Sequence, residues 1–187
     1  MKAQIWATEL EAGFAISKFG FRRVSSGAFG YYSNGSCVLA VSGIGPVAAA
    51  LCAADVIARF EPAEIMNFGA CGALGGRFLP GDVLEIGSVA CADPFSDAVY
   101  ELCSGGAALV TSSRPAVSAA RRAELGARFD AADMEAHGIL RAMEAAGMGP
   151  ELFYCAKLVS DFSPSCDIRG NIRRLISNLE KTIEERV

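Results

Sequence analysis

The sequence predicts an α/β fold, a three-layer αβα sandwich with a central mixed, largely parallel sheet. Short apolar segments alternate with longer segments of helical character, an order that builds a sheet covered by helices on both faces. Most of the apolar segments lack alternating polar residues, which indicates strands buried on both sides. The chain shows no linker, repeat or low-complexity tail. We therefore expect a single domain over residues 1–187.

Local signals place the elements in order. The predicted strands lie at residues 3–7, 27–32, 36–41, 64–68, 83–86, 107–111 and 152–159. The predicted helices lie at residues 9–18, 46–60, 134–146 and 168–186. Asn34-Gly35 is a strong hairpin signal between the second and third strands, and Pro46 suits the first turn of the second helix. Asp133 is a plausible cap for the third helix, and Gly147 ends it.

Composition excludes several classes of protein. With 52% hydrophobic and 20% charged residues, the chain is typical of a globular protein. A net charge of -4 argues against a nucleic-acid partner, and the basic cluster Arg169, Arg173 and Arg174 is interpreted as a solvated helix face. The longest apolar runs are too short for a membrane span. Glu9 comes too early for a secretory signal.

Cysteine and histidine usage argues against a metal centre. The seven cysteines are odd in number and show no Cys-x-x-Cys spacing, so we expect buried thiols in a reducing cytoplasm. The only histidine is His137, which makes a zinc site or a Ser-His-Asp triad a poor hypothesis. No metal or cofactor is implied.

Two segments of small residues follow predicted strands, where ligands bind in such sheets. In Ser42-Gly43-Ile44-Gly45 the glycines let the backbone approach a ligand, and the next helix offers unpaired N–H groups. Residues 69–76, rich in glycine, are expected to form a turn with room for a planar ligand. An ordinary tight turn is the alternative in both cases. Neither segment is a dinucleotide fingerprint or a P-loop.

Acidic residues are the candidates for chemistry at the start of the third helix. The side chains of Asp133 and Glu135 flank Met134. A buried carboxylate needs hydrogen-bond donors, and it can accept from two neighbouring sugar hydroxyls at once. Capping of the helix is the alternative for both acids.

Two further acidic positions adjoin predicted strands. Asp161 ends a buried strand, where a carboxyl group can act as a general acid; the alternative is a loop acid paired with Lys157 or Arg169. Either Glu9 or Glu11 could orient or deprotonate a water, with a plain helix-start acid as the alternative.

These segments together resemble the nucleoside phosphorylase and nucleosidase superfamily, and within it the 5′-methylthioadenosine/S-adenosylhomocysteine nucleosidases. The resemblance covers most of the chain. It rests on Glu-x-Glu at 9–11, Ser-Gly-Ile-Gly-x-Val-x-Ala-Ala at 42–50, Asn-x-Gly-x-x-Gly-x-Leu at 67–74, Gly-Asp-Val at 81–83, Met-Glu-Ala at 134–136 and Ser160-Asp161. No single segment is diagnostic, but six in this order make a chance match improbable.

The resemblance implies a nucleoside phosphorylase-like fold and a set of roles. Glu11 would hold the attacking water, Met134 and Glu135 would bind the ribose, and Asp161, with Ser160 beside it, would protonate N7 of a purine. The same pocket would be lined by Ala7, Ile44, Gly69, Ala70 and Cys71. A homo-oligomer, with a dimer favoured, is also implied.

Four departures from the family pattern affect the base and 5′ sides of the pocket. Ala70 replaces a usual serine, Lys157 replaces an arginine, and residues 89–107 form a shorter segment. Ser112-Ser113-Arg114-Pro115 stands where the family often has a base-stacking phenylalanine.

The resulting hypothesis is a nucleosidase that hydrolyses the N-glycosidic bond of a purine nucleoside or a 5′-modified relative. Hydrolysis is favoured over phosphorolysis because an anionic Glu11 would repel phosphate. One alternative is a nucleosidase or phosphorylase of a specialised intermediate, such as futalosine or an adenosylated lipid. The other is a nucleoside-binding protein without catalytic activity.

Overall fold

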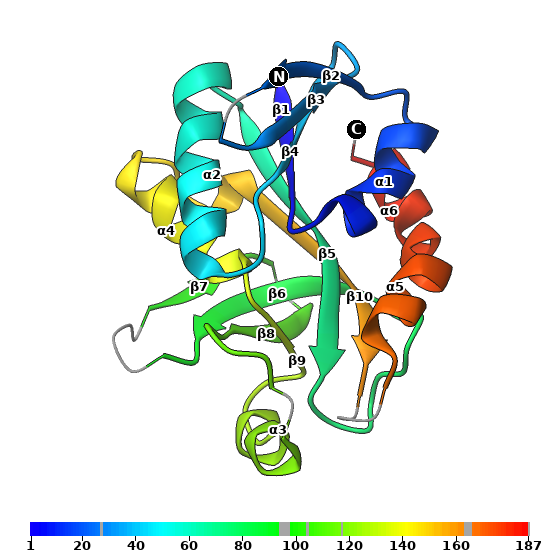
Figure 1. The fold of residues 1–187 in the computed structure, drawn as a ribbon. Coiled ribbons are helices and arrows are strands. Elements are labelled where there is room, and N and C mark those ends of the chain that lie inside the picture. The colour runs from blue at the N-terminus through cyan, green and yellow to red at the C-terminus, as the bar shows by residue number, and fades with distance from the viewer. Residues whose placement is uncertain (27, 94–97, 104, 117, 163–165, 187) are drawn as a thin grey trace.

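The computed structural model describes residues 1–26, 28–93, 98–103, 105–116, 118–162 and 166–186, and it shows a central sheet with helices on both faces (Figure 1). The strands are β1 (Lys2–Trp6), β2 (Arg22–Ser26), β3 (Gly30–Ser33), β4 (Cys37–Val41), β5 (Glu64–Ala73), β6 (Val83–Cys91), β7 (Val99–Glu101), β8 (Ala107–Thr111), β9 (Ala131–Asp133) and β10 (Phe153–Asp161). The helices are α1 (Glu9–Lys18), α2 (Pro46–Phe60), α3 (Ala119–Gly126), α4 (Ala136–Ala145), α5 (Ile168–Leu175) and α6 (Glu180–Glu184). Two short 3₁₀ helices, Pro150–Leu152 and Ile176–Leu179, complete the secondary structure.

The sheet is mixed, as expected, and part of it closes on itself. Its order is β10-β6-β8-β9-β5-β1-β4-β3-β2, and β10 pairs again with β5. The pairs β1–β4, β1–β5, β10–β5, β6–β8 and β8–β9 are parallel. Because β1, β4, β5 and β10 run in the same direction, their carboxyl ends meet at one edge of the sheet.

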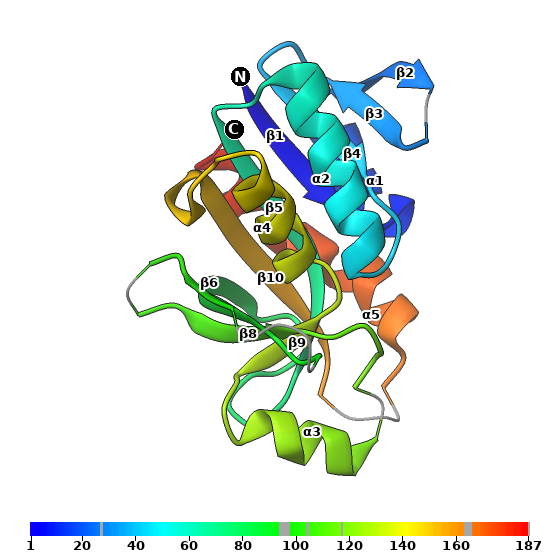
Figure 2. The same ribbon diagram turned by 90° about the vertical axis from the view of Figure 1, so that its left-hand side faces the viewer.

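Helices cover both faces, which confirms the predicted layers. Helices α2 and α4 lie side by side on one face (Figure 2), and their core contains Cys52, Val56 and Ile139. Helices α1, α5 and α6 lie on the other face, where the core contains Trp6 and Phe68. No helix in the described part of the chain is long and apolar enough to cross a membrane.

Several elements differ from the sequence predictions. Strand β5 continues to Ala73 through the glycine-rich residues expected to form a turn, because β10 pairs with it as far as Gly72 and β9 with its last two residues. Helix α4 begins at Ala136 because the chain is still paired in β9 at Asp133. The single closing helix expected at 168–186 is divided by a 3₁₀ turn. The elements β2, β7, β9 and α3 were not predicted.

The N-terminal ends of helices α2 and α4 pack tightly against each other. A Cβ on Gly138 would overlap the backbone carbonyl of Pro46, so only glycine allows this approach. The same approach lets the backbone N–H of Gly45 donate to Glu135, with N to Oε1 at 3.0 Å. Packing of these two helix ends therefore positions a candidate site residue.

We expect Gly138→Ala to destabilise the fold by about 1–3 kcal/mol, because the added methyl meets backbone that cannot rotate away. Urea denaturation measures this change. Gly13→Ala in α1 is the matched control, since nothing lies within 4 Å of its added Cβ. That control should stabilise the protein by about 0.5–1 kcal/mol through helix propensity. Equal midpoints for the two variants would contradict the proposed packing constraint.

Candidate active site

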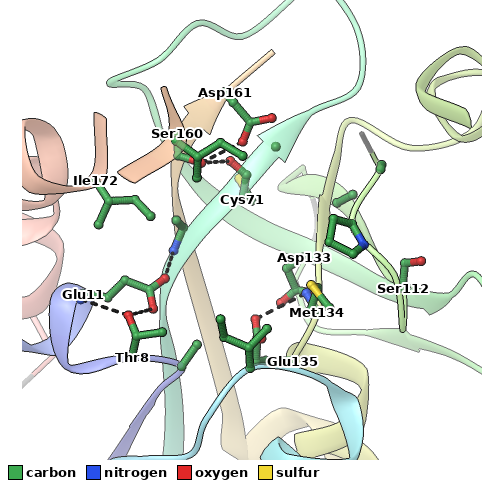
Figure 3. Close-up of a pocket in the computed structure, with 18 of the residues that line it drawn as sticks. Thr8, Glu11, Cys71, Ser112, Asp133, Met134, Glu135, Ser160, Asp161 and Ile172 are labelled. Atoms are coloured by element: carbon green, nitrogen blue, oxygen red, sulfur yellow. Dashed lines mark hydrogen bonds between the residues drawn. The ribbon is translucent and has the colours of Figure 1, made fainter. Parts of the chain in front are cut away.

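A cavity of about 490 Å³ opens at the edge where the parallel strands end. Its wall contains residues from β5, β9, β10, α1, α3 and α5, together with the segments after β1, β4 and β8. The cavity therefore lies at the edge of the sheet where the sequence predicts a ligand. Figure 3 shows Asp161 and Glu135 on opposite sides of this cavity, with Glu11 at a third position.

Glu11 is buried and fixed by two donors. The hydroxyl of Thr8, the residue that caps α1, donates to Oε2 at 2.7 Å, and the backbone N–H of Ala70 donates to Oε1 at 2.9 Å. Ala70 thus contributes its amide to the site, although it lacks the family's usual serine hydroxyl. The carboxylate lines the cavity in a fixed orientation and can accept a proton from a bound water.

The structure decides between the two acidic candidates of the first helix. Glu9 accepts from the hydroxyl of Tyr32 at an exposed position, with Oη to Oε1 at 2.8 Å, and does not line the cavity. Of this pair, only Glu11 lines the cavity.

Glu135 lies at another wall of the cavity and is 5% exposed. Gly45 donates to its Oε1, and the N–H of Met134 approaches its Oε2 at 3.3 Å. Burial, followed by the nearby negative charge of Asp133, raises the pKa of Glu135 to about 7; Lys157 and the Gly45 amide act in the opposite direction. Near neutral pH this group is therefore poised between a hydrogen-bond donor and a full carboxylate acceptor.

Asp133 is the last residue of β9 and not the predicted cap, a position that Glu135 occupies, because α4 begins only at Ala136; its carboxylate still accepts from the first N–H of α4 and forms a buried ion pair. Its Oδ2 accepts from the N–H of Ala136 at 3.0 Å and lies 2.9 Å from Nζ of Lys157, while Thr111 donates to Oδ1 at 2.6 Å. Burial alone would lower the pKa of Lys157, but Asp133, Cys155 and Glu135 raise it, and the net shift is upward. The ammonium therefore stays charged although it is fully buried.

Asp161 is paired with an arginine that sequence analysis did not identify. Its Oδ2 forms an ion pair with Nη2 of Arg122 in α3, and its Oδ1 accepts from Ser160 at 2.8 Å. Lys157 and Arg169, the partners considered from sequence, do not form this pair. Ser118, Ala119 and Gly126 are the signals that could have predicted α3, since they cap, favour and end a helix.

The remaining predicted residues are mostly in the cavity wall. Ala7, Ile44, Ala70, Cys71, Met134 and Ser160 line it. Gly69 does not; a Cβ there would lie 3.1 Å from Oε1 of Glu11, so this glycine leaves room for the carboxylate. His137 is buried beside Tyr100 and does not line the cavity.

Three exposed arginines also line the cavity, namely Arg114, Arg169 and Arg173. The last two were interpreted from sequence as a solvated helix face. They are exposed, but the fold of α5 places them at the rim of this cavity.

Comparison with known proteins supports a common fold. The sequence model of one protein family, the phosphorylase superfamily, matches residues 8–90 of this chain. No curated protein matches the sequence significantly. The 5′-methylthioadenosine/S-adenosylhomocysteine nucleosidase of Neisseria meningitidis superposes with a TM-score of 0.81 at 24% identity, covering 98% of this chain and 96% of that one.

Two further solved structures have the same fold. Futalosine hydrolase of Helicobacter pylori strain 26695 gives a TM-score of 0.83 at 15% identity, over 98% of this chain and 97% of that one. A putative 5′-methylthioadenosine/S-adenosylhomocysteine nucleosidase from Francisella philomiragia gives 0.82 at 17% identity, over 100% and 99%. The expected resemblance to the nucleoside phosphorylase and nucleosidase superfamily is thereby confirmed.

The raised pKa of Glu135 predicts a pH dependence. If the ionised form binds sugar hydroxyls, kcat/KM for a nucleoside should rise with pH and level off above about 7, since this ratio reports the free enzyme. Glu135→Gln should lower kcat/KM and remove this step in the pH profile.

Stability provides an independent measurement of the same shift. The unfolded chain ionises Glu135 near its ordinary value of 4.5, whereas the folded protein keeps the proton up to about 7. Its contribution to stability is therefore complete below pH 4.5 and is lost as pH rises through 7. Wild type and Glu135→Gln with parallel pH–stability curves would contradict the shift.

Proposed function

We propose that this chain, which matches the phosphorylase superfamily in sequence and the nucleosidases in fold, hydrolyses the N-glycosidic bond of a purine nucleoside or a 5′-modified relative. One observation carries the proposal. Three buried carboxylates from separate elements, Glu11, Glu135 and Asp161, line one cavity, and each is fixed by hydrogen bonds.

The proposed roles follow from the charges that develop as the bond breaks. The ribose becomes positive and the departing purine becomes negative. The site therefore needs a hydrogen-bond acceptor beside the ribose and a proton donor beside the purine. Glu135 would accept from the ribose hydroxyls, and Met134 would pack beside the sugar. Asp161 would give a proton to the base, with Ser160 holding its other oxygen, and Glu11 would take a proton from water.

Hydrolysis is preferred to phosphorolysis because of the surroundings of Glu11. Both donors to this carboxylate, Thr8 and the Ala70 amide, are neutral, and they hold it in the cavity wall. A second anion beside it would be repelled, whereas water can donate to it. Phosphate is therefore a poor nucleophile for this position.

Variants of the acidic residues test the mechanism directly. Asp161→Asn and Glu11→Gln should each lower kcat for base release by about 10²–10⁴-fold, the usual contribution of general acid–base groups. Glu9→Gln is the matched control for Glu11, because its carboxylate contacts Tyr32 outside the cavity. Release of free base is measured by chromatography for purine nucleosides with varied 5′ groups.

Product analysis distinguishes the alternatives. Free ribose formed without phosphate supports a hydrolase. Ribose 1-phosphate formed only with phosphate would overturn that choice. Calorimetric binding of nucleosides without release of base would instead support a binding protein of the same fold, and full activity of Asp161→Asn would exclude this carboxyl as the acid.

We further propose that the protein works in the cytoplasm as a homodimer. Cys37, Cys52, Cys71 and Cys155 are buried thiols, which suits a reducing compartment. The exposed apolar side chains of Ile44, Val47 and Leu51 form a stripe, here called the α2 stripe, along the start of α2. Ile44 also lines the cavity, so a second copy seated on the α2 stripe would cover that side of the site.

Sedimentation measures this association. Wild type should sediment with twice the mass of the chain, and Leu51→Glu should shift it toward the monomer because a charge would be buried at the contact. Leu79→Glu is the control, since Leu79 is comparably exposed, at 58% against 61%, and lies outside the stripe. Dimers retained by Leu51→Glu would exclude the α2 stripe as the interface.

A further inference from the structure

Arg122 is a buried cation in the wall of the cavity, beside the proposed acid to the base. It is 8% exposed, and it is the arginine of α3 that lines the cavity. Its Nη1 donates to the carbonyl of Ala73 at 2.9 Å, and its Nη2 donates to Oδ2 of Asp161. The guanidinium is thus fixed by one carbonyl and one carboxylate.

The Arg122 guanidinium has N–H groups that donate to no described residue. Of its five N–H groups these two bonds use two, and the other three have no partner among the described residues. One of the three is the Nε–H, which is shielded from the cavity. The donors left for a ligand are therefore the second N–H groups of Nη1 and Nη2, on a side chain that is 10% exposed, and a ligand that brings an acceptor to them would satisfy them.

A glycine keeps this part of the cavity open. A Cβ on Gly72 would lie 3.1 Å from Oδ2 of Asp161 and 3.3 Å from Nη2 of Arg122. The cavity wall therefore presents a strong donor and a carboxyl group as close neighbours, with no side chain between β5 and the pair.

We propose that Arg122 makes the site selective for 6-oxopurine nucleosides over 6-aminopurine nucleosides. This inference rests on the proposed function and narrows its substrate class. A 6-oxopurine presents two acceptors on one edge, O6 and N7, and arginine is the side chain that most often reads this pair. Arg122 would donate to O6 while the carboxyl group of Asp161 serves N7.

A 6-aminopurine fits the same wall poorly. Its edge presents N7 as an acceptor but an amino group as a donor. With N7 placed against Asp161, the amino group would face the N–H groups of Arg122, and those donors would be left without an acceptor. Sites built around buried polar groups reject ligands that leave those groups unpaired.

The same arrangement assists departure of the base. When the bond between C1′ and N9 breaks, its electron pair stays with the purine, and in a 6-oxopurine the negative charge extends to O6. Arg122 would stabilise the charge at O6, and N7 would take the proton from Asp161. The water oxygen bonds to C1′ as Glu11 takes one water proton, and solvent restores both carboxyl groups.

Paired substrates test the selectivity. Inosine and adenosine differ only at position 6, so kcat/KM for base release is compared between them. Wild type should prefer inosine by about tenfold or more, the factor expected when one buried donor loses its acceptor on the amino base. Arg122→Met should remove that preference mainly by losing activity on inosine, and Arg121→Met is the matched control, since Arg121 pairs with Glu124 outside the cavity.

Binding of the free bases separates this inference from the proposed function. Wild type should bind hypoxanthine more tightly than adenine by calorimetry whether or not it turns over nucleosides. Arg122→Lys, which keeps the charge but not the fork of donors, should show a reduced preference and serves if Arg122→Met does not fold.

Other outcomes would overturn one proposal or the other. A wild type that releases or binds adenine in preference would overturn the selectivity and leave the nucleosidase intact. Preference for hypoxanthine without release of base from any nucleoside would overturn the nucleosidase and leave the role of Arg122 intact. Unchanged preference in a folded Arg122→Met would exclude Arg122 as its cause.

Discussion

The buried ion pair between Lys157 and Asp133 is the interaction on which the candidate site depends. The Lys157 side chain is 1% exposed and that of Asp133 is fully buried. Asp133 also accepts from Thr111 at the end of β8 and from Ala136 at the start of α4. One carboxylate thus joins the ends of β8 and β9 and the middle of β10 to the helix that follows Glu135.

The pair also controls the electrostatics of the cavity. Without the Lys157 cation, Asp133 and Glu135 would be two neighbouring buried acids that had lost the positive charge now acting on both. Breaking such a buried pair by removing one partner typically costs about 3–5 kcal/mol, because the other charge loses its compensation. Lys157 holds Asp133 in a buried ion pair that stabilises the fold. It also opposes the upward pKa shift of Glu135 that burial and Asp133 produce.

A second buried pair has the same form on the other side of the cavity. Arg122 pairs with Asp161 as Lys157 pairs with Asp133, but the side chains of Arg122 and Asp161 are 10% and 6% exposed, against 1% and 0% for Lys157 and Asp133. Asp133 already accepts from three protein donors, whereas Arg122 keeps N–H groups that no described residue uses. The first pair builds the site, and the second is placed to contact a ligand. Close packing of α2 on α4 then sets the position of Glu135, which accepts from the Gly45 N–H at the start of α2.

Sequence by itself determined the elements with local signals and the acidic candidates of the site. Strong end signals explain why α2, which starts at Pro46, and the hairpin at Asn34-Gly35 were predicted correctly. Glu11, Glu135 and Asp161 were identified because acids stand out beside apolar strands and within a recognisable series of motifs; their roles remain predictions.

Only the tertiary structure decided which charges pair and where short strands end. Asp161 and Arg122 are separated by 39 positions, and nothing near either residue specifies the other. Strand β9 has three residues, too few to show a pattern, and the length of β5 depends on its pairing with β9 and β10. The physical reason is common to all of these: helix ends and tight turns are set by neighbours in sequence, whereas ion pairs and strand pairing depend on segments that only the fold brings together.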